Sequence, residues 1–108
     1  MEIFGKLSTQ AQEVLKVLGE SGSGQIKFEQ VHNSAYFTKF SVDGRILATE
    51  ADGRRIEFYR VALEELDQWK LVNRAYDAYN LTTKGDEVYQ VNLEQSQLPS
   101  DGVKTQIL

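Results

Sequence analysis

The residues best suited to bind a charged ligand are arginines. Arg54, Arg55 and Arg60 fall within one short segment, and Arg74 follows further along the chain. Guanidinium groups bind phosphate oxygens well, and duplex DNA carries one phosphate charge per ~1.7 Å of its axis. These four residues are therefore the candidate DNA contacts. The same segment also carries carboxylates, so the alternative is a solvated face whose charges pair locally.

A second set of residues suits contact with another protein. Phe37, Phe58, Val61 and Trp69 are apolar, and each is expected at the margin of the core or outside it. Phe and Trp side chains often anchor protein–protein contacts. Either the C-terminal tail covers these groups, or they bind a partner chain or a second copy of this one.

Catalytic and metal-binding chemistry has few residues to draw on. His32 is the single histidine, and the chain has no cysteine. Glu64, Glu65 and Asp67 would spread around a helix and would not converge on an ion. The glycine-rich stretch 19–24 lacks the Lys-Ser/Thr ending of a phosphate loop. We therefore expect no enzyme activity, no cofactor, no bound metal and no small-molecule substrate.

The arginines and most of the apolar candidates lie on one predicted helix, residues 53–69. Asp52 is the expected N-cap. The residues that share the apolar arc are Ile56, Tyr59, Ala62, Leu63 and Leu66. The opposite arc is centred on Glu57, Val61, Glu64 and Gln68. The helical period thus predicts a core-facing stripe and a charged outer face.

The segment before this helix changes from a helical period to a strand period. Residues 9–19 predict an amphipathic helix that buries Leu15 and Leu18. From residue 25 the period is two, which predicts antiparallel strands with a turn at Asn33-Ser34. In this pattern Tyr36, Thr38, Phe40 and Val42 face one side, and Phe37 belongs to the outward row with Lys39. That strand is expected to offer an unpaired edge to a partner.

Further strands and one more helix complete the predicted domain. Asp43-Gly44 fits a tight turn, and residues 45–48 suggest a short third strand. Residues 71–72 and 79–81 are two short β-prone runs that would pair as a hairpin. A short helix carrying Val88 and Tyr89 then starts at Thr82 or Thr83. The domain is expected to cover residues 6–92, with a mobile tail over residues 93–108.

Composition agrees with one folded domain. The chain has 108 residues, 41% of them hydrophobic and 26% charged, with a formal net charge of −4. These values are typical of a globular protein, and an acidic balance argues against binding polyanions by bulk charge. No apolar run is long enough to span a membrane, and residues 1–6 lack the character of a signal peptide. We expect a cytoplasmic protein.

Two motifs resemble the winged-helix domains of bacteria. The first is the run Leu63 to Val72, and the second is Leu81-Thr82-Thr83-Lys84-Gly85. In those domains the third helix ends in a leucine-rich pattern with glycine, and the second wing strand ends in leucine-threonine-x-x-glycine. Lys70 stands here where that glycine usually occurs. The expected strands within residues 25–48 replace the second helix of the DNA-binding members.

The resemblance implies a winged-helix-like α+β fold with the order helix, β-hairpin, long helix, small β-wing and short helix. Some domains of this kind are accessory parts of larger bacterial chains. The resulting hypothesis is a non-catalytic interaction module that binds a protein partner or a second copy. The alternative is a DNA-binding regulator that reads duplex DNA with helix 53–69.

Overall fold

The computed structural model describes residues 3–31 and 36–97, which form four helices and a five-stranded antiparallel sheet. The elements are α1 (Ile3–Lys6), α2 (Thr9–Glu20), β1 (Gln25–Gln30), β2 (Phe37–Val42), β3 (Arg45–Thr49), α3 (Gly53–Gln68), β4 (Val72–Arg74), β5 (Ala78–Leu81) and α4 (Thr83–Gln97). The fold class is therefore α+β.

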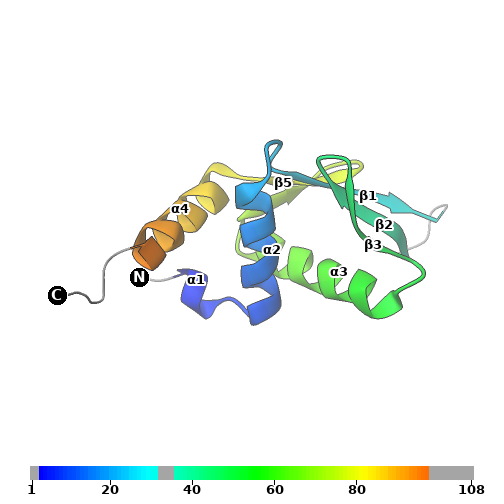
Figure 1. Cartoon of the computed structure of the whole chain (residues 1–108), viewed down its shortest axis with the longest axis horizontal. Coiled ribbons are helices and arrows are strands. Elements are labelled where there is room, and N and C mark those ends of the chain that lie inside the picture. The colour runs from blue at the N-terminus through cyan, green and yellow to red at the C-terminus, as the bar shows by residue number, and fades with distance from the viewer. Residues whose placement is uncertain (1–2, 32–35, 98–108) are drawn as a thin grey trace.

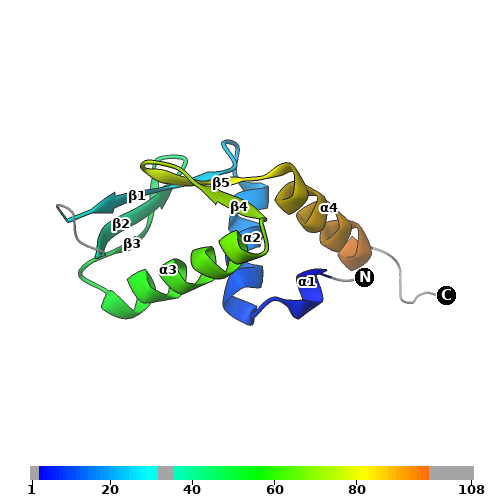
Figure 2. The same cartoon turned by 180° about the vertical axis from the view of Figure 1, so that it is seen from behind.

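The helices lie on one side of the sheet (Figures 1 and 2). α3 runs across one face of the sheet, and α2 crosses α3. α4 packs against α2 at the end of the molecule away from β2 and β3. Gly19 makes this contact close, because a Cβ at Gly19 would lie 2.4 Å from the ring of Tyr89. No described element covers the opposite face of the sheet, which is mostly polar.

The hairpin and the wing join into one sheet with the strand order β3-β2-β1-β5-β4. β1 pairs with β2 on one side and with β5 on the other. The turn between β2 and β3 has positive φ at Asp43 and Gly44, which confirms the expected tight turn. β2 is an inner strand, so the prediction that it offers an unpaired edge is wrong.

Both ends of α3 are capped. The Asp52 carboxylate accepts the N–H of Arg55 at 3.1 Å, as expected for the N-cap. At the other end, Lys70 has φ 66°. The N–H of Leu71 donates to the carbonyl of Leu66, and that of Lys70 donates to Asp67, which is a Schellman motif. Lysine therefore occupies the left-handed position that glycine fits best.

The two motif segments meet at the start of α4. The N–H of Thr82 donates to the carbonyl of Leu71, and its hydroxyl donates to the carbonyl of Lys70. The same hydroxyl accepts the N–H of Gly85, so Thr82 caps α4. A Cβ at Gly85 would lie 2.1 Å from the carbonyl oxygen of Leu71. Threonine and glycine are thus both needed to dock α4 beside the end of α3.

The core lies between the sheet and the helices. The five residues predicted to fill it are all buried, namely Leu15, Leu18, Tyr59, Leu63 and Leu66. They join a cluster that includes the aromatic rings of Phe28, Phe40 and Tyr79. The predicted arc of α3 is therefore confirmed as its buried face.

The two ends of the described chain are more helical than expected. α1 was not predicted, and it buries Phe4. α4 runs to Gln97, so residues 93–97, which the sequence pattern places in a tail, are helical. His32, the turn at residues 33–34 and the tail from residue 98 lie outside the described residues.

Candidate functional site

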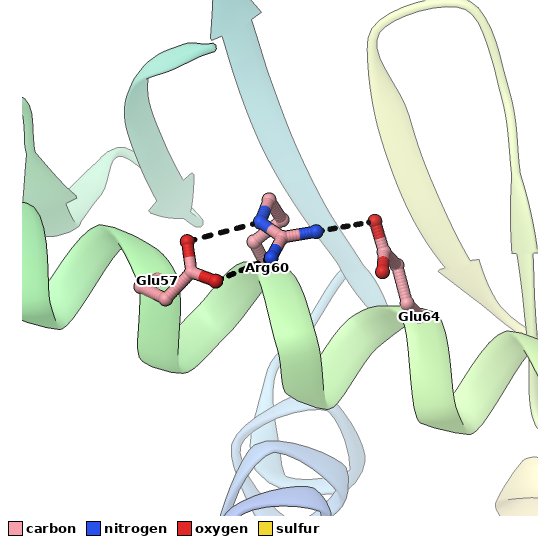
Figure 3. Close-up of polar contacts among 3 residues, drawn as sticks. All are labelled: Glu57, Arg60 and Glu64. Atoms are coloured by element: carbon pink, nitrogen blue, oxygen red, sulfur yellow. Dashed lines mark hydrogen bonds and ion pairs between the residues drawn. The ribbon is translucent and has the colours of Figure 1, made fainter. Parts of the chain in front are cut away.

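The outer face of α3 carries a short ladder of alternating charge (Figure 3). Arg60 lies between two carboxylates, with its Nε 3.1 Å from one oxygen of Glu57 and its Nη1 2.8 Å from Glu64. Its Nη2 bonds the second oxygen of Glu57. The hydrogen bond from Arg60 lowers the pKa of Glu57, and the same bond raises the pKa of Arg60. The charge of Arg60 is thus matched within the helix.

Arg55 also has contacts within the chain, a hydrogen bond and a cation–π contact. Its Nε donates to the backbone carbonyl of Leu47 on β3 at 2.5 Å. Its guanidinium carbon lies 5.5 Å from the centroid of the Tyr59 ring. Arg55 therefore ties the start of α3 to the edge of the sheet.

Arg74 covers one end of the aromatic core. Its guanidinium carbon lies 5.2 Å from the ring centroid of Phe28, 5.7 Å from that of Phe37 and 5.8 Å from that of Tyr79. Burial raises the pKa of the Tyr79 hydroxyl, and the nearby Arg74 charge lowers it in part. Cation–π contact with three rings accounts for the position of Arg74 without a ligand.

The four candidate DNA contacts therefore do not form one free basic surface. Arg54 is exposed and makes no ion pair or hydrogen bond with the described residues. Arg55, Arg60 and Arg74 each have partners within the chain. A phosphate would have to compete with those partners. This geometry favours the interpretation that the charges on α3 pair locally.

The four candidate protein contacts are also placed differently from one another. Val61 is 36% exposed, as its place on the outer arc predicts. Phe58 and Trp69 are half-buried and pack against the core. Phe37, expected on the outward row, is only 5% exposed, so that expectation is wrong. The four residues do not make one patch.

A β-bulge explains the position of Phe37. Glu29 pairs with Lys39, but the next residue, Gln30, pairs with Phe37, so Thr38 is an extra residue in β2. One extra residue reverses which side chains face the core on the far side of the bulge. Phe37 therefore turns inward, whereas Tyr36, just before β2, is 78% exposed.

Phe37 and Thr38 at this bulge line an apolar groove that the sequence pattern did not reveal. The groove lies between the start of β2 and the start of α3 and has a volume of about 490 Å³. Its lining residues are Val31, Tyr36, Phe37, Thr38, Glu50, Gly53, Ile56 and Glu57. We call this the β2–α3 groove. Most of its side chains are apolar, and the charged residues among its described lining are two carboxylates, Glu50 and Glu57.

A second hollow, of about 420 Å³, lies between α2 and α3 and includes Phe58. It differs in charge, because Glu13, Lys16, Glu20 and Arg55 line it together. Opposite charges on one wall can satisfy each other without a ligand. The β2–α3 groove is therefore the better candidate for binding an apolar side chain.

Other kinds of site are not apparent in the described part of the chain. No three His, Cys, Asp or Glu side chains lie together as metal ligands among residues 3–31 and 36–97. Glu65, from the acidic run, instead accepts hydrogen bonds from the backbone and hydroxyl of Ser8. Within the same residues, no helix has the length and apolar character required to cross a membrane.

Comparison with known proteins adds no relative from which a function could be transferred. No protein-family model, curated protein or solved structure matches the chain.

Proposed function

We propose that this chain is a non-catalytic, winged-helix-like interaction module that binds a protein partner in the β2–α3 groove. The observation that carries the proposal is the exposure of Tyr36 and Val31, at 78% and 40%, beside the buried apolar groups of Phe37 and Ile56. Large apolar side chains gathered at a hollow are typical of surfaces that anchor a partner.

The winged-helix-like assignment rests on the two motifs. The leucine-rich end of α3 and the Leu-Thr-Thr-Lys-Gly segment contact each other through Leu71, Thr82 and Gly85. The β-wing of β4 and β5 joins these motifs, since β4 begins at Val72 and β5 ends at Leu81. DNA binding is the weaker alternative, because Arg55, Arg60 and Arg74 already have partners.

Differential capture tests the proposed function. The wild-type chain and two tyrosine variants, Tyr36→Ser and Tyr76→Ser, are immobilised and exposed to a lysate of the organism that encodes the protein. Tyr76 is the matched control, because it is 98% exposed at the wing turn and does not line the groove. Circular dichroism shows whether each variant is folded.

We expect a protein that binds the wild type and Tyr76→Ser but not Tyr36→Ser. A truncated anchor in an interface typically weakens binding by about tenfold or more. Equal capture by all three chains, or capture that depends on Tyr76 alone, would contradict the proposal. So would capture of nothing but duplex DNA.

A further inference from the structure

The chemistry of the β2–α3 groove restricts the kind of partner that it can bind. The apolar lining comes from two elements, with Phe37 from β2 and Ile56 from α3 both almost fully buried. Val31 and Tyr36 remain exposed beside them. A hollow of this size accepts one or two large side chains and not a whole domain.

Among the described residues, the charged side chains that line the groove have one sign. Glu50 and Glu57 both line it, and none of the described lining residues is basic. The backbone N–H of Glu50 donates to Thr38, but its carboxylate makes no ion pair with any described residue. The charge of Glu57 is offset by Arg60, which hydrogen-bonds both of its carboxylate oxygens. A cation in the groove would therefore meet Glu50, the lining carboxylate without an ion pair among the described residues.

Resting on the proposed function, we infer that the β2–α3 groove binds a linear protein segment in which a large apolar side chain lies next to lysine or arginine. The apolar side chain would enter between Tyr36 and Ile56, and the cation would lie against Glu50. Complementary charge at a rim chiefly increases the association rate and selects among partners.

Two other occupants fit the groove less well. Phosphate groups of a nucleic acid would be repelled by Glu50, and Glu57 already occupies the nearby cation Arg60. A second copy of this chain brings a net charge of −4, which opposes docking on a surface with carboxylates. Both are nevertheless distinct outcomes of the test.

Selection from a display library of random short peptides provides the test. The library is selected in parallel on the wild type, Tyr36→Ser, Glu50→Gln and Glu87→Gln. Glu87→Gln is the charge-matched control, because Glu87 is exposed on α4 and does not line the groove. Enriched peptides are then measured by fluorescence anisotropy at several salt concentrations. Light scattering reports the mass of each chain.

The expected peptides carry a large apolar residue beside Lys or Arg. Glu50→Gln should weaken the affinity of these peptides by about threefold, and Tyr36→Ser by about tenfold or more. Glu87→Gln should leave their affinity unchanged. Their affinity should fall as salt rises.

The inference and the proposed function fail in different ways. The charge inference is contradicted if the peptides need Tyr36 for binding but lack basic residues, or if Glu50→Gln does not change their affinity. The proposed function is then still supported. If no enriched peptide depends on Tyr36 for binding, both the charge inference and the proposed function are contradicted. A dimer mass that Tyr36→Ser reduces to the monomer mass overturns the inference in favour of a second copy.

Discussion

Lys70 has a backbone conformation that suits its side chain poorly. Its φ of 66° follows from the Schellman motif that ends α3, and a side chain in this left-handed region is strained. Lys70→Gly should therefore raise the free energy of unfolding by about 0.5–1 kcal/mol, after allowing for the greater freedom of glycine in the unfolded chain. Chemical denaturation followed by circular dichroism measures the change.

The control for this prediction is Lys70→Ala. It removes the lysine side chain but keeps the Cβ that causes the strain, so it should give no such gain. If Lys70→Gly is no more stable than Lys70→Ala, the strain at this position is not significant.

Asp43 links two turns through its carboxylate. One oxygen lies 2.6 Å from the Ser23 hydroxyl and the other 2.8 Å from the Gly22 nitrogen. These hydrogen bonds, the one from Ser23 first, lower the pKa of Asp43 below its ordinary value of 3.8. The unfolded chain binds this proton more readily than the folded chain does. The carboxylate of Asp43 therefore stabilises the fold above its ordinary pKa, and this stabilisation is lost as pH falls below that value.

Asp43→Asn should therefore reduce the loss of stability between neutral pH and strongly acidic pH. The measurement is urea unfolding at both values for the wild type, Asp43→Asn and the control Asp77→Asn. Asp77 is exposed, and its carboxylate has no hydrogen-bond partner among the described residues. An identical acid dependence in the wild type and Asp43→Asn would be inconsistent with the assigned role of the carboxylate.

At the scale of elements, β3 is an edge strand that is protected at its centre. Ser41 and Phe40 on β2 pair with Ile46 and Ala48, which leaves Leu47 as an extra residue in β3. The Leu47 carbonyl accepts a hydrogen bond from Arg55. Bulges and covered carbonyls both prevent an edge from pairing with another chain.

Replacing Arg55 should expose this edge. Arg55→Ala is expected to self-associate more than Arg54→Ala, which removes a neighbouring arginine that has no partner in the described residues. Sedimentation velocity over a range of concentrations measures the mass of each variant. Equal monomer masses throughout would show that Arg55 does not protect the edge.

The helices were more predictable from the sequence than the groove. The period of 3.6 residues gave the buried arc of α3, and its outer arc includes Glu57, Val61 and Glu64, all exposed. A helix keeps this relation between spacing and face along its whole length. In a strand, one extra residue reverses the face on which all later side chains lie. Nothing in the local pattern marks Thr38 as that extra residue.

Contacts between distant segments were likewise beyond the sequence pattern. β1 and β5 pair through residues 25–27 and 78–80, which joins the hairpin and the wing. The groove brings residue 31 of one segment near residue 57 of another. Such contacts depend on how the sheet and helix pack, and not on a local period.

At the scale of the whole molecule, the charge pairing makes a prediction about DNA. If Arg54, Arg55 and Arg60 all contacted phosphates, the logarithm of affinity would fall with the logarithm of salt with a slope near ~−2.7. Because Arg55 and Arg60 are engaged, we expect a slope no steeper than ~−0.9, the value for one contact.

Gel-shift titrations against pooled random duplexes measure this slope. Arg54→Ala should abolish what weak binding there is, and Arg60→Ala should not change it. A slope near ~−2.7 that Arg55→Ala and Arg60→Ala each flatten by ~1 would support the DNA-binding alternative instead.

Binding of a partner segment in the β2–α3 groove can be observed in the backbone amide NMR spectrum. The wild type is titrated with the peptide that binds it most tightly among those selected. We expect the largest chemical-shift changes at Val31, Tyr36, Thr38 and Glu57, which line the groove, and none of comparable size at the wing turn. Changes centred on Tyr76, or on the α2 side of Phe58, would show that the peptide binds elsewhere.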